Sequence, residues 1–183
     1  MFDHFGLLAP FYDRAIRFSR LEHMLRLAAL PADGLLLDVA GGTGRVAAAL
    51  RPHVGEVLVA DLSIGMLRQA RRKGLAGIIT PAERLPFPDA AFARVIMVDA
   101  LHHVIHQGEA VSELWRVLKP GGRLVIEEPD VRTWPVKLVA VAEKLALMRS
   151  RFLSPPRIAA LFPSEARITI ETERWNAWLI VEK

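Results

Sequence analysis

The chain has 183 residues, of which 52% are hydrophobic and 24% charged, and it contains no cysteine. This length suits one compact domain, and the apolar composition excludes a disordered chain. The lack of cysteine excludes disulfides, zinc–thiolate sites, iron–sulfur clusters and cysteine nucleophiles. No uncharged apolar run reaches the roughly 20 residues of a membrane span, and the chain does not start like a secretory signal, so we expect a cytoplasmic protein.

Basic residues slightly outnumber acidic ones, 24 to 20, which gives a formal net charge of +4. The densest basic run, at residues 68–73, is typical of a solvated helix face, although it would also suit phosphate or an anionic membrane surface. The chain shows no repeat, flexible linker or low-complexity tract. We therefore expect a single domain over residues 1–183, with a helical segment at 1–30 and the core at 34–183.

The hydrophobic pattern predicts helices and strands in alternation. One or two helices are expected over residues 2–30, interrupted near Pro10, and a turn over 31–34. Short apolar strands are predicted, in chain order, over residues 35–39, 57–61, 76–80, 94–98 and 123–127. Helices are predicted over residues 46–50, 64–73, 109–118 and 136–149, the third of them ending at a turn over 119–122. Alternating apolar and polar residues predict an antiparallel hairpin, with strands over residues 167–173 and 177–182.

Strands that alternate with helices form βαβ units and hence a parallel sheet. We expect an α/β fold: a Rossmann-like, doubly wound, mostly parallel seven-stranded sheet with helices on both faces and a C-terminal antiparallel hairpin. Such sheets bind ligands beyond the carboxyl ends of the strands, where the strand order reverses. Residues 40–44 and Asp61, which end the first two core strands, are therefore where we expect the site.

The loop after the first core strand, at residues 38–45, contains three glycines in four positions. Glycines let a ligand approach bare backbone, and the following helix offers unpaired N–H groups. The acid Asp61 ends the second strand, at a distance that suits a carboxylate accepting hydrogen bonds from ribose hydroxyls. Residues 42–47 also satisfy the G-x-G-x-x-A fingerprint, so an NAD-dependent oxidoreductase is one alternative.

Residues 36–44, 61–67, 82–87 and 114–122 resemble, in this order, the characteristic segments of the class I S-adenosylmethionine-dependent methyltransferases. The resemblance covers nearly the whole chain. The Ala-Gly-Gly-Thr-Gly loop, together with the pattern over residues 5–13, is most similar to the ubiquinone/menaquinone biosynthesis C-methyltransferases and their small-molecule relatives.

The resemblance implies an enzyme of the EC 2.1.1 class that uses S-adenosyl-L-methionine to methylate a small molecule by in-line transfer. It implies that the loop backbone faces the methionine part, that Asp38 orients the loop, that Asp61 holds the ribose and that Tyr12 closes over the cofactor. The cofactor-binding residues implied in this way are Tyr12, Asp38, Ala40, Gly41, Gly42, Gly44, Asp61, Leu62, Met66, Ala82, Glu83, Val98 and Asp99.

The chain departs from the family's pattern in three respects. Ala40 stands for the usual first glycine, which costs little if its φ angle is negative. Pro81 stands where the family usually has an aspartate that contacts the adenine amino group, so Glu83 or a backbone carbonyl is the alternative acceptor. The region after the fifth strand, which builds much of the acceptor site in this family, is short.

Some methyl acceptors need a base, and histidine titrates near neutral pH. His102 and His103 directly follow the fourth strand and are the candidate catalytic residues, with a loop or packing role as the alternative. We expect only one of them to face the cofactor. Glu127, Glu128 and Asp130 are alternative bases or acceptor contacts, and the histidine spacing does not indicate a metal site.

The helix over residues 136–149 is apolar on more than one face. It either packs on the sheet, lines a pocket for a lipophilic acceptor, or rests on an anionic membrane surface. A small-molecule acceptor is the expected partner, and nucleic acid is disfavoured because no Asn-Pro-Pro-aromatic motif follows the fourth strand. An RNA methyltransferase and a non-catalytic or partner-dependent module of the same fold are the alternatives; the sequence leaves the acceptor and the oligomeric state open.

Overall fold

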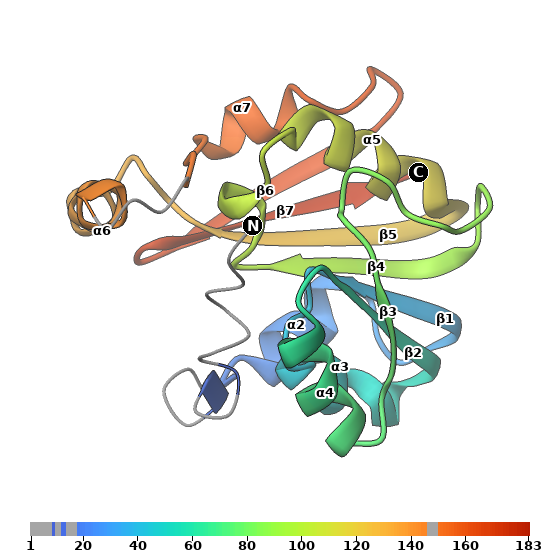
Figure 1. The fold of residues 1–183 in the computed structure, drawn as a ribbon. Coiled ribbons are helices and arrows are strands. Elements are labelled where there is room, and N and C mark those ends of the chain that lie inside the picture. The colour runs from blue at the N-terminus through green and yellow to red at the C-terminus, as the bar shows by residue number, and fades with distance from the viewer. Residues whose placement is uncertain (1–8, 10–11, 14–17, 146–149) are drawn as a thin grey trace.

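The computed structural model describes residues 9, 12–13, 18–145 and 150–183. Its centre is a seven-stranded sheet in the order β3-β2-β1-β4-β5-β7-β6 (Figure 1). The strands are β1 (Ala32–Val39), β2 (Val54–Asp61), β3 (Ala76–Ile79), β4 (Phe92–Val98), β5 (Leu118–Pro129), β6 (Arg167–Glu173) and β7 (Asn176–Glu182). Neighbouring strands from β3 to β5 are parallel, while β7 is antiparallel to both β5 and β6. The predicted fold class is confirmed.

Helices cover both faces of this sheet. They are α2 (Leu21–Leu27), α3 (Arg45–Leu50), α4 (Ile64–Arg72), α5 (Gln107–Val117) and α7 (Pro155–Ala159), with short 3₁₀ turns η1 (Arg51–His53) and η2 (Leu101–His103). Helix α6 (Trp134–Leu145) lies beyond the carboxyl end of β5 (Figure 1). Side chains of the central strands alternate between two cores, because successive residues of a strand point to opposite faces. Leu36 packs with α2, α3 and α4, and Leu37 packs with α5 and α7. Figure 1 shows these two groups of helices on opposite sides of the sheet.

Two predicted turns are wrong, because the strand ladders continue through them. The segment 119–122 belongs to β5, which begins directly after α5: Leu118 pairs with Phe92, and the register shifts before Arg123 pairs with Arg94. Gly121, with a φ of 72°, lies in this irregularity. In the same way β1 begins at Ala32 and shifts register before Leu35, within the turn predicted over 31–34.

Other boundaries differ in smaller ways. Helix α5 begins at Gln107, slightly before the predicted start, and α7 was not predicted because its five residues are too few for a periodic pattern. Of the helices expected over 2–30, the structure describes α2, and most of the expected segment before it lies outside the described residues. Residues 146–149, the end of the helix predicted over 136–149, also lie outside the described residues.

The strand order reverses between β1 and β4, whose neighbours lie on opposite sides. The carboxyl ends of β1, β2 and β4 therefore open onto one edge of the sheet, where doubly wound folds bind their ligands. Residues 40–44, Asp61 and residues 98–103 meet along this edge. Within the described ranges, no helix combines the length and the apolar character that crossing a bilayer requires.

Candidate functional site

Asp61 joins the loops that follow β1 and β2. One carboxylate oxygen, Oδ2, accepts a hydrogen bond from the Gly42 N–H at 2.8 Å, and the other, Oδ1, accepts one from the Ser63 N–H at 2.7 Å. Ser63 also begins helix α4, since its hydroxyl accepts from the Met66 N–H at 3.3 Å. The acid predicted to hold a ribose is therefore fixed against the glycine loop.

The glycine loop presents bare backbone beside Asp61. Gly42 has a φ of 56°, and a side chain there would meet only the Met66 sulfur, 3.8 Å from the Cβ position. Gly44 precedes the first residue of α3 and packs against Leu75. A flat nucleoside or an amino-acid moiety can therefore lie against this backbone without meeting a side chain of the loop glycines.

Asp38 lies directly beneath the loop and is 1% exposed. A Cβ atom on Gly41 would lie 2.5 Å from the Asp38 carboxyl carbon, so only glycine fits above this side chain. Among the described residues, neither oxygen of the Asp38 carboxyl has a partner with hydrogen-bond geometry. Burial, together with the charge of Asp61, raises the pKa of Asp38 to about 7, although Arg45 and the Ala47 N–H act in the opposite direction. The loop thus rests on a carboxyl group that titrates near neutral pH.

Two residues without the freedom of glycine adopt left-handed backbone at this edge. Ala40, at the end of β1, has a φ of 52°, and Asp99, at the end of β4, has a φ of 58°. Alanine at position 40 was expected to cost little only if its φ were negative. Because its φ is positive, Ala40 carries a strain of about 1 kcal/mol. Strained residues of this kind cluster at ligand sites. Here they flank the point at which the strand order reverses.

Asp13 contacts both the glycine loop and the residue that follows helix α4. One oxygen of Asp13 accepts from the Thr43 hydroxyl at 2.5 Å, and the other pairs with Lys73. Lys73 also donates to the Thr43 carbonyl at 2.6 Å. The basic run at residues 68–73 was predicted to be a solvated helix face, and Lys73 departs from that prediction. The only feature of the sequence that sets Lys73 apart from the rest of this run is its position at the end of the predicted helix, just before Gly74.

Tyr12 lies among the charged groups of the site. Burial and the charges of Asp99 and Asp61 raise the pKa of the Tyr12 hydroxyl, whereas the charge of Arg45 and a hydrogen bond with it lower that pKa. Tyr12, which the resemblance implies closes over the cofactor, therefore lies within electrostatic range of Arg45, Asp99 and Asp61. Arg45, the first residue of α3, was not among the predicted site residues.

The other cofactor-binding residues that the resemblance implies on this side of the loop, Leu62, Met66, Ala82 and Glu83, are spread between the surface and the core. Leu62 is 64% exposed next to Asp61, while Met66 and Ala82 are buried. The Glu83 carboxylate accepts from the His106 N–H at 3.4 Å. Pro81 offers only its carbonyl, which accepts from the Thr80 hydroxyl at 3.3 Å.

His102 and His103 differ in their surroundings. His102 is buried, and its Nδ1 lies 2.7 Å from Glu128 Oε2. His103 is half-buried, and its Nδ1 lies 3.1 Å from the Ser150 hydroxyl. Val98 and Asp99, half-buried at the end of β4, precede the η2 turn that carries both histidines. His103 is thus the better placed of the two to reach a ligand.

The three acids at the carboxyl end of β5 and directly after it are held in ion pairs or hydrogen bonds. Glu127 Oε1 accepts from Arg20 at 2.5 Å and from Asn176 at 2.8 Å. Arg132 hydrogen bonds to Asp130 and holds the pKa of that carboxyl below its usual value. Glu128, beside His102, is buried. These contacts are typical of residues that hold the end of a strand in place, here the carboxyl end of β5.

Replacing Glu128 with alanine is expected to lower the free energy of unfolding by about 3 kcal/mol. Its Oε1 accepts from the N–H groups of Ala100 and Leu101, at 2.9 and 2.7 Å, so the variant leaves buried donors without an acceptor. Urea denaturation measures the loss, with Glu109→Ala, on the exposed side of α5, as the control that changes stability by less than about 0.5 kcal/mol. A loss below about 1 kcal/mol would contradict a structural role for Glu128.

Comparison with known families agrees with this geometry. Residues 37–126 match the family model described as a methyltransferase domain. A ubiquinone/menaquinone biosynthesis C-methyltransferase, UbiE, of Pseudomonas putida is 41% identical over 115 residues, which cover 57% of this chain and 45% of the relative. The UbiE protein of Pseudomonas aeruginosa is 39% identical over a segment of the same length. The match thus spans less than half the length of these relatives.

Several solved structures have the same fold as this chain. The YcgJ protein of Bacillus subtilis superposes with a TM-score of 0.74 and 28% identity, over 83% of this chain and 70% of that one. An S-adenosylmethionine-dependent methyltransferase of Thermotoga maritima superposes with a TM-score of 0.78 over 100% of both chains, at 22% identity. Residues 37–126 thus match the methyltransferase domain family, and the chain has the Rossmann-like fold of these solved structures.

Proposed function

We propose that the chain transfers a methyl group from S-adenosylmethionine to a small lipophilic molecule. The observation that carries this proposal is the Asp61 carboxylate, fixed by the Gly42 and Ser63 N–H groups beside a loop of bare backbone at the point of strand reversal. The matching methyltransferase domain, residues 37–126, contains this whole arrangement.

The residues of the site suit the parts of this cofactor. When bound, S-adenosylmethionine supplies an electrophilic methyl group on a sulfonium. Asp61 would accept hydrogen bonds from the ribose hydroxyls, residues 40–44 would lie along the methionine part, and Leu62 with Met66 would contact the adenine. Tyr12 would cover the ligand and exclude water, which in-line transfer requires as much as it requires alignment.

Helix α6 supports a lipophilic acceptor. It follows β5 at the end of the sheet that carries the glycine loop (Figure 1). Trp134 is 72% exposed, and Leu138 and Val141 are also exposed, so these side chains do not pack on the sheet. The Pseudomonas relatives are named for the biosynthesis of ubiquinone and menaquinone, which are lipophilic. The first acceptors to test are therefore phenols and quinols with apolar chains.

Asp61→Ala is expected to weaken binding of S-adenosylmethionine and S-adenosylhomocysteine at least tenfold, because it removes the charged acceptor for the ribose. Isothermal titration calorimetry measures both affinities, with NAD as the ligand that should not bind. Asp33→Ala, an exposed acid at the opposite end of β1, is the matched control and should bind like the wild type. Failure of the wild-type protein to bind either sulfur ligand would refute the proposal.

His103 is the residue that we propose as the base or the acceptor contact. Once an acceptor has been found, His103→Asn is expected to reduce the rate of methyl transfer by 10²-fold or more if a proton must be removed. The affinity for S-adenosylmethionine should stay unchanged, and the dependence of the rate on pH near neutrality should disappear. An unchanged pH profile would remove His103 from the proposal without affecting the cofactor assignment.

A further inference from the structure

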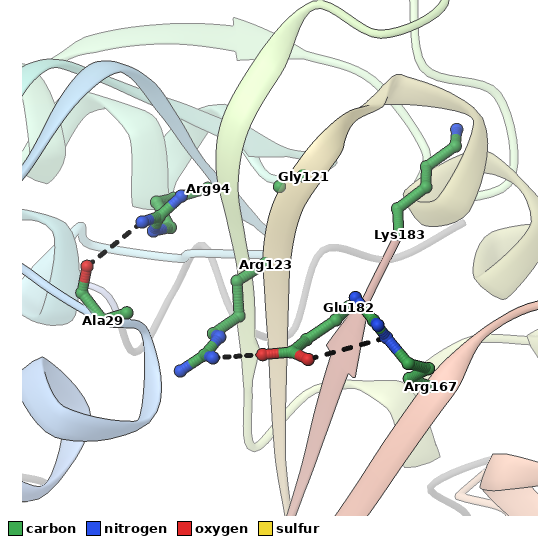
Figure 2. A pocket seen from close by; sticks show the side chains of 8 residues that line it. Ala29, Arg94, Gly121, Arg123, Arg167, Glu182 and Lys183 are labelled. Atoms are coloured by element: carbon green, nitrogen blue, oxygen red, sulfur yellow. Dashed lines mark hydrogen bonds and ion pairs between the residues drawn. The ribbon is translucent and has the colours of Figure 1, made fainter.

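A second hollow lies at the opposite end of the sheet from the glycine loop. Its volume is about 170 Å³. It is lined by residues near the amino ends of β4 and β5, by the first residue of β6 and by the last residue of β7 (Figure 2). Arg94 and Arg123 face each other across β4 and β5, where they are paired in the ladder. Nothing in the proposed methyl transfer uses this place.

The hollow has more positive than negative charge. Arg94, Arg123 and Arg167 line it together with one carboxylate, that of Glu182. Glu182 hydrogen bonds to Arg123 through one oxygen and pairs with Arg167 through the other, at 3.8 Å. The ammonium of Lys183 is turned toward the Trp115 carbonyl, at 2.7 Å. Two of the three guanidinium groups, those of Arg123 and Arg167, therefore share the carboxylate of Glu182.

Arg94 is the cation that this carboxylate leaves uncompensated. Among the described residues, no carboxylate lies within ion-pair distance of Arg94. Its guanidinium instead donates to three backbone carbonyls: Ala28 at 2.6 Å, Ala93 at 2.8 Å and Ala29 at 3.1 Å. Figure 2 shows it turned toward Ala29. Burial and the neighbouring charge of Arg123 lower the pKa of Arg94, as expected for like charges held together.

These contacts fix the orientation of Arg94 before any ligand arrives. A guanidinium has five N–H donors, so three bonds to carbonyls hold the group in place while others stay available. Arg123 is held similarly, by Glu182 and by the Leu27 carbonyl at 3.3 Å. Because the side chains are already ordered, an anion that binds here loses little affinity to ordering them.

We propose that this hollow binds the phosphate group of a small molecule. Arginine forks match the oxygens of phosphate and bind it through charge-assisted hydrogen bonds. The volume of about 170 Å³ is several times the roughly 30 Å³ of one water molecule and admits a tetrahedral oxyanion. A doubly charged anion would also balance the two positive charges that Glu182 does not compensate. The ligand is either free inorganic phosphate or a phosphomonoester.

Gly121 provides a substitution that leaves every arginine in place. It lines the hollow with a φ of 72°, and a Cβ atom there would meet nothing within 4 Å. Aspartate and asparagine both tolerate this backbone conformation and have nearly the same shape, but only aspartate adds a negative charge. Gly121→Asp should therefore weaken phosphate binding at least tenfold, whereas Gly121→Asn should stay within about threefold of the wild type.

The experiment titrates the full chain with inorganic phosphate and with phenyl phosphate, at constant ionic strength maintained with chloride, by calorimetry or NMR. Tighter binding of phenyl phosphate identifies a phosphomonoester site, and tighter binding of inorganic phosphate identifies a site for the free ion. Arg167→Gln, at an exposed side chain, should weaken binding about tenfold, and Arg71→Gln, on the exposed face of α4, should not. The proposal is overturned if phosphate does not bind saturably, or if Gly121→Asp and Arg167→Gln both bind it like the wild type.

Discussion

Between pH 5 and pH 8 the free energy of unfolding of the wild-type protein is expected to fall by about 2.5 kcal/mol through the titration of Asp38. Replacing Asp38 by asparagine is expected to abolish this fall. Burial raises the pKa of Asp38 from 3.8 in the unfolded chain to about 7 in the folded one. Below the lower value both states are protonated, and the shift has no effect on stability. As the pH rises toward 7, the unfolded chain releases the proton first, so the folded state becomes progressively less stable. The loss is nearly complete at pH 8, where both states are ionised.

Urea denaturation of the wild type and of Asp38→Asn, at pH 5 and pH 8, measures this difference. The comparison between the two proteins cancels the titration of the histidines, which both contain. Glu113, Asp130 and Glu171 do not interfere, because hydrogen bonds from arginines hold their pKa values below the usual range, so they are ionised at both pH values. Equal pH dependence in the two proteins would show that Asp38 is ionised in the folded state at pH 5.

Gly41→Ala is expected to lower the free energy of unfolding by about 2–3 kcal/mol and to abolish binding of S-adenosylmethionine. The new methyl group would lie 2.5 Å from the Asp38 carboxyl carbon, and neither the central strand β1 nor the buried carboxyl can move away easily. The loop would have to rise from Asp38, which would shift the Gly42 N–H away from Asp61. Denaturation and calorimetry on the same sample measure the two effects.

A double-mutant cycle shows whether the Asp38 carboxyl causes this loss. In an Asp38→Ala background the space occupied by the carboxyl is open, so the same Gly41→Ala change should cost less than about 1 kcal/mol. Gly108→Ala is the control: it lies on α5 with nothing within 4 Å of its Cβ position, and it should raise stability by about 0.5–1 kcal/mol through helix propensity. Equal costs of Gly41→Ala in both backgrounds would rule out the clash.

Much of the fold follows from local patterns in the sequence. Short apolar runs separated by periodic segments specify β1 to β5, and the alternation over residues 167–182 specifies the hairpin. The segment at Lys119–Gly122 was misjudged because Pro and Gly mark turns locally, whereas pairing with β4 and the contact of Gly121 with Lys183 extend the strand. Hydrogen bonding between distant segments decided this boundary, and a local pattern does not contain that information.

The geometry of the candidate site likewise depends partly on local sequence patterns and partly on contacts between distant segments. The proximity of the glycine loop and Asp61 was predictable because each ends a core strand. The contacts of Asp13 with Thr43 and Lys73 join residues that are 30 and 60 positions apart along the chain, and no spacing rule brings them together. The surroundings of His102 depend on Glu128, which becomes a neighbour only when β4 and β5 pair. Likewise, the positive φ of Ala40 is imposed by the path of the loop.

The ion pair between Asp13 and Lys73 also influences how firmly Asp13 is held beside the glycine loop. The side chains of Asp13 and Lys73 are 39% and 28% exposed, so water and dissolved salt reach their ion pair. A pair of this kind contributes no more than about 1 kcal/mol, and screening by salt reduces it further. The ion pair therefore holds Asp13 to Lys73 only weakly, and its strength varies with the ionic strength of the surrounding medium.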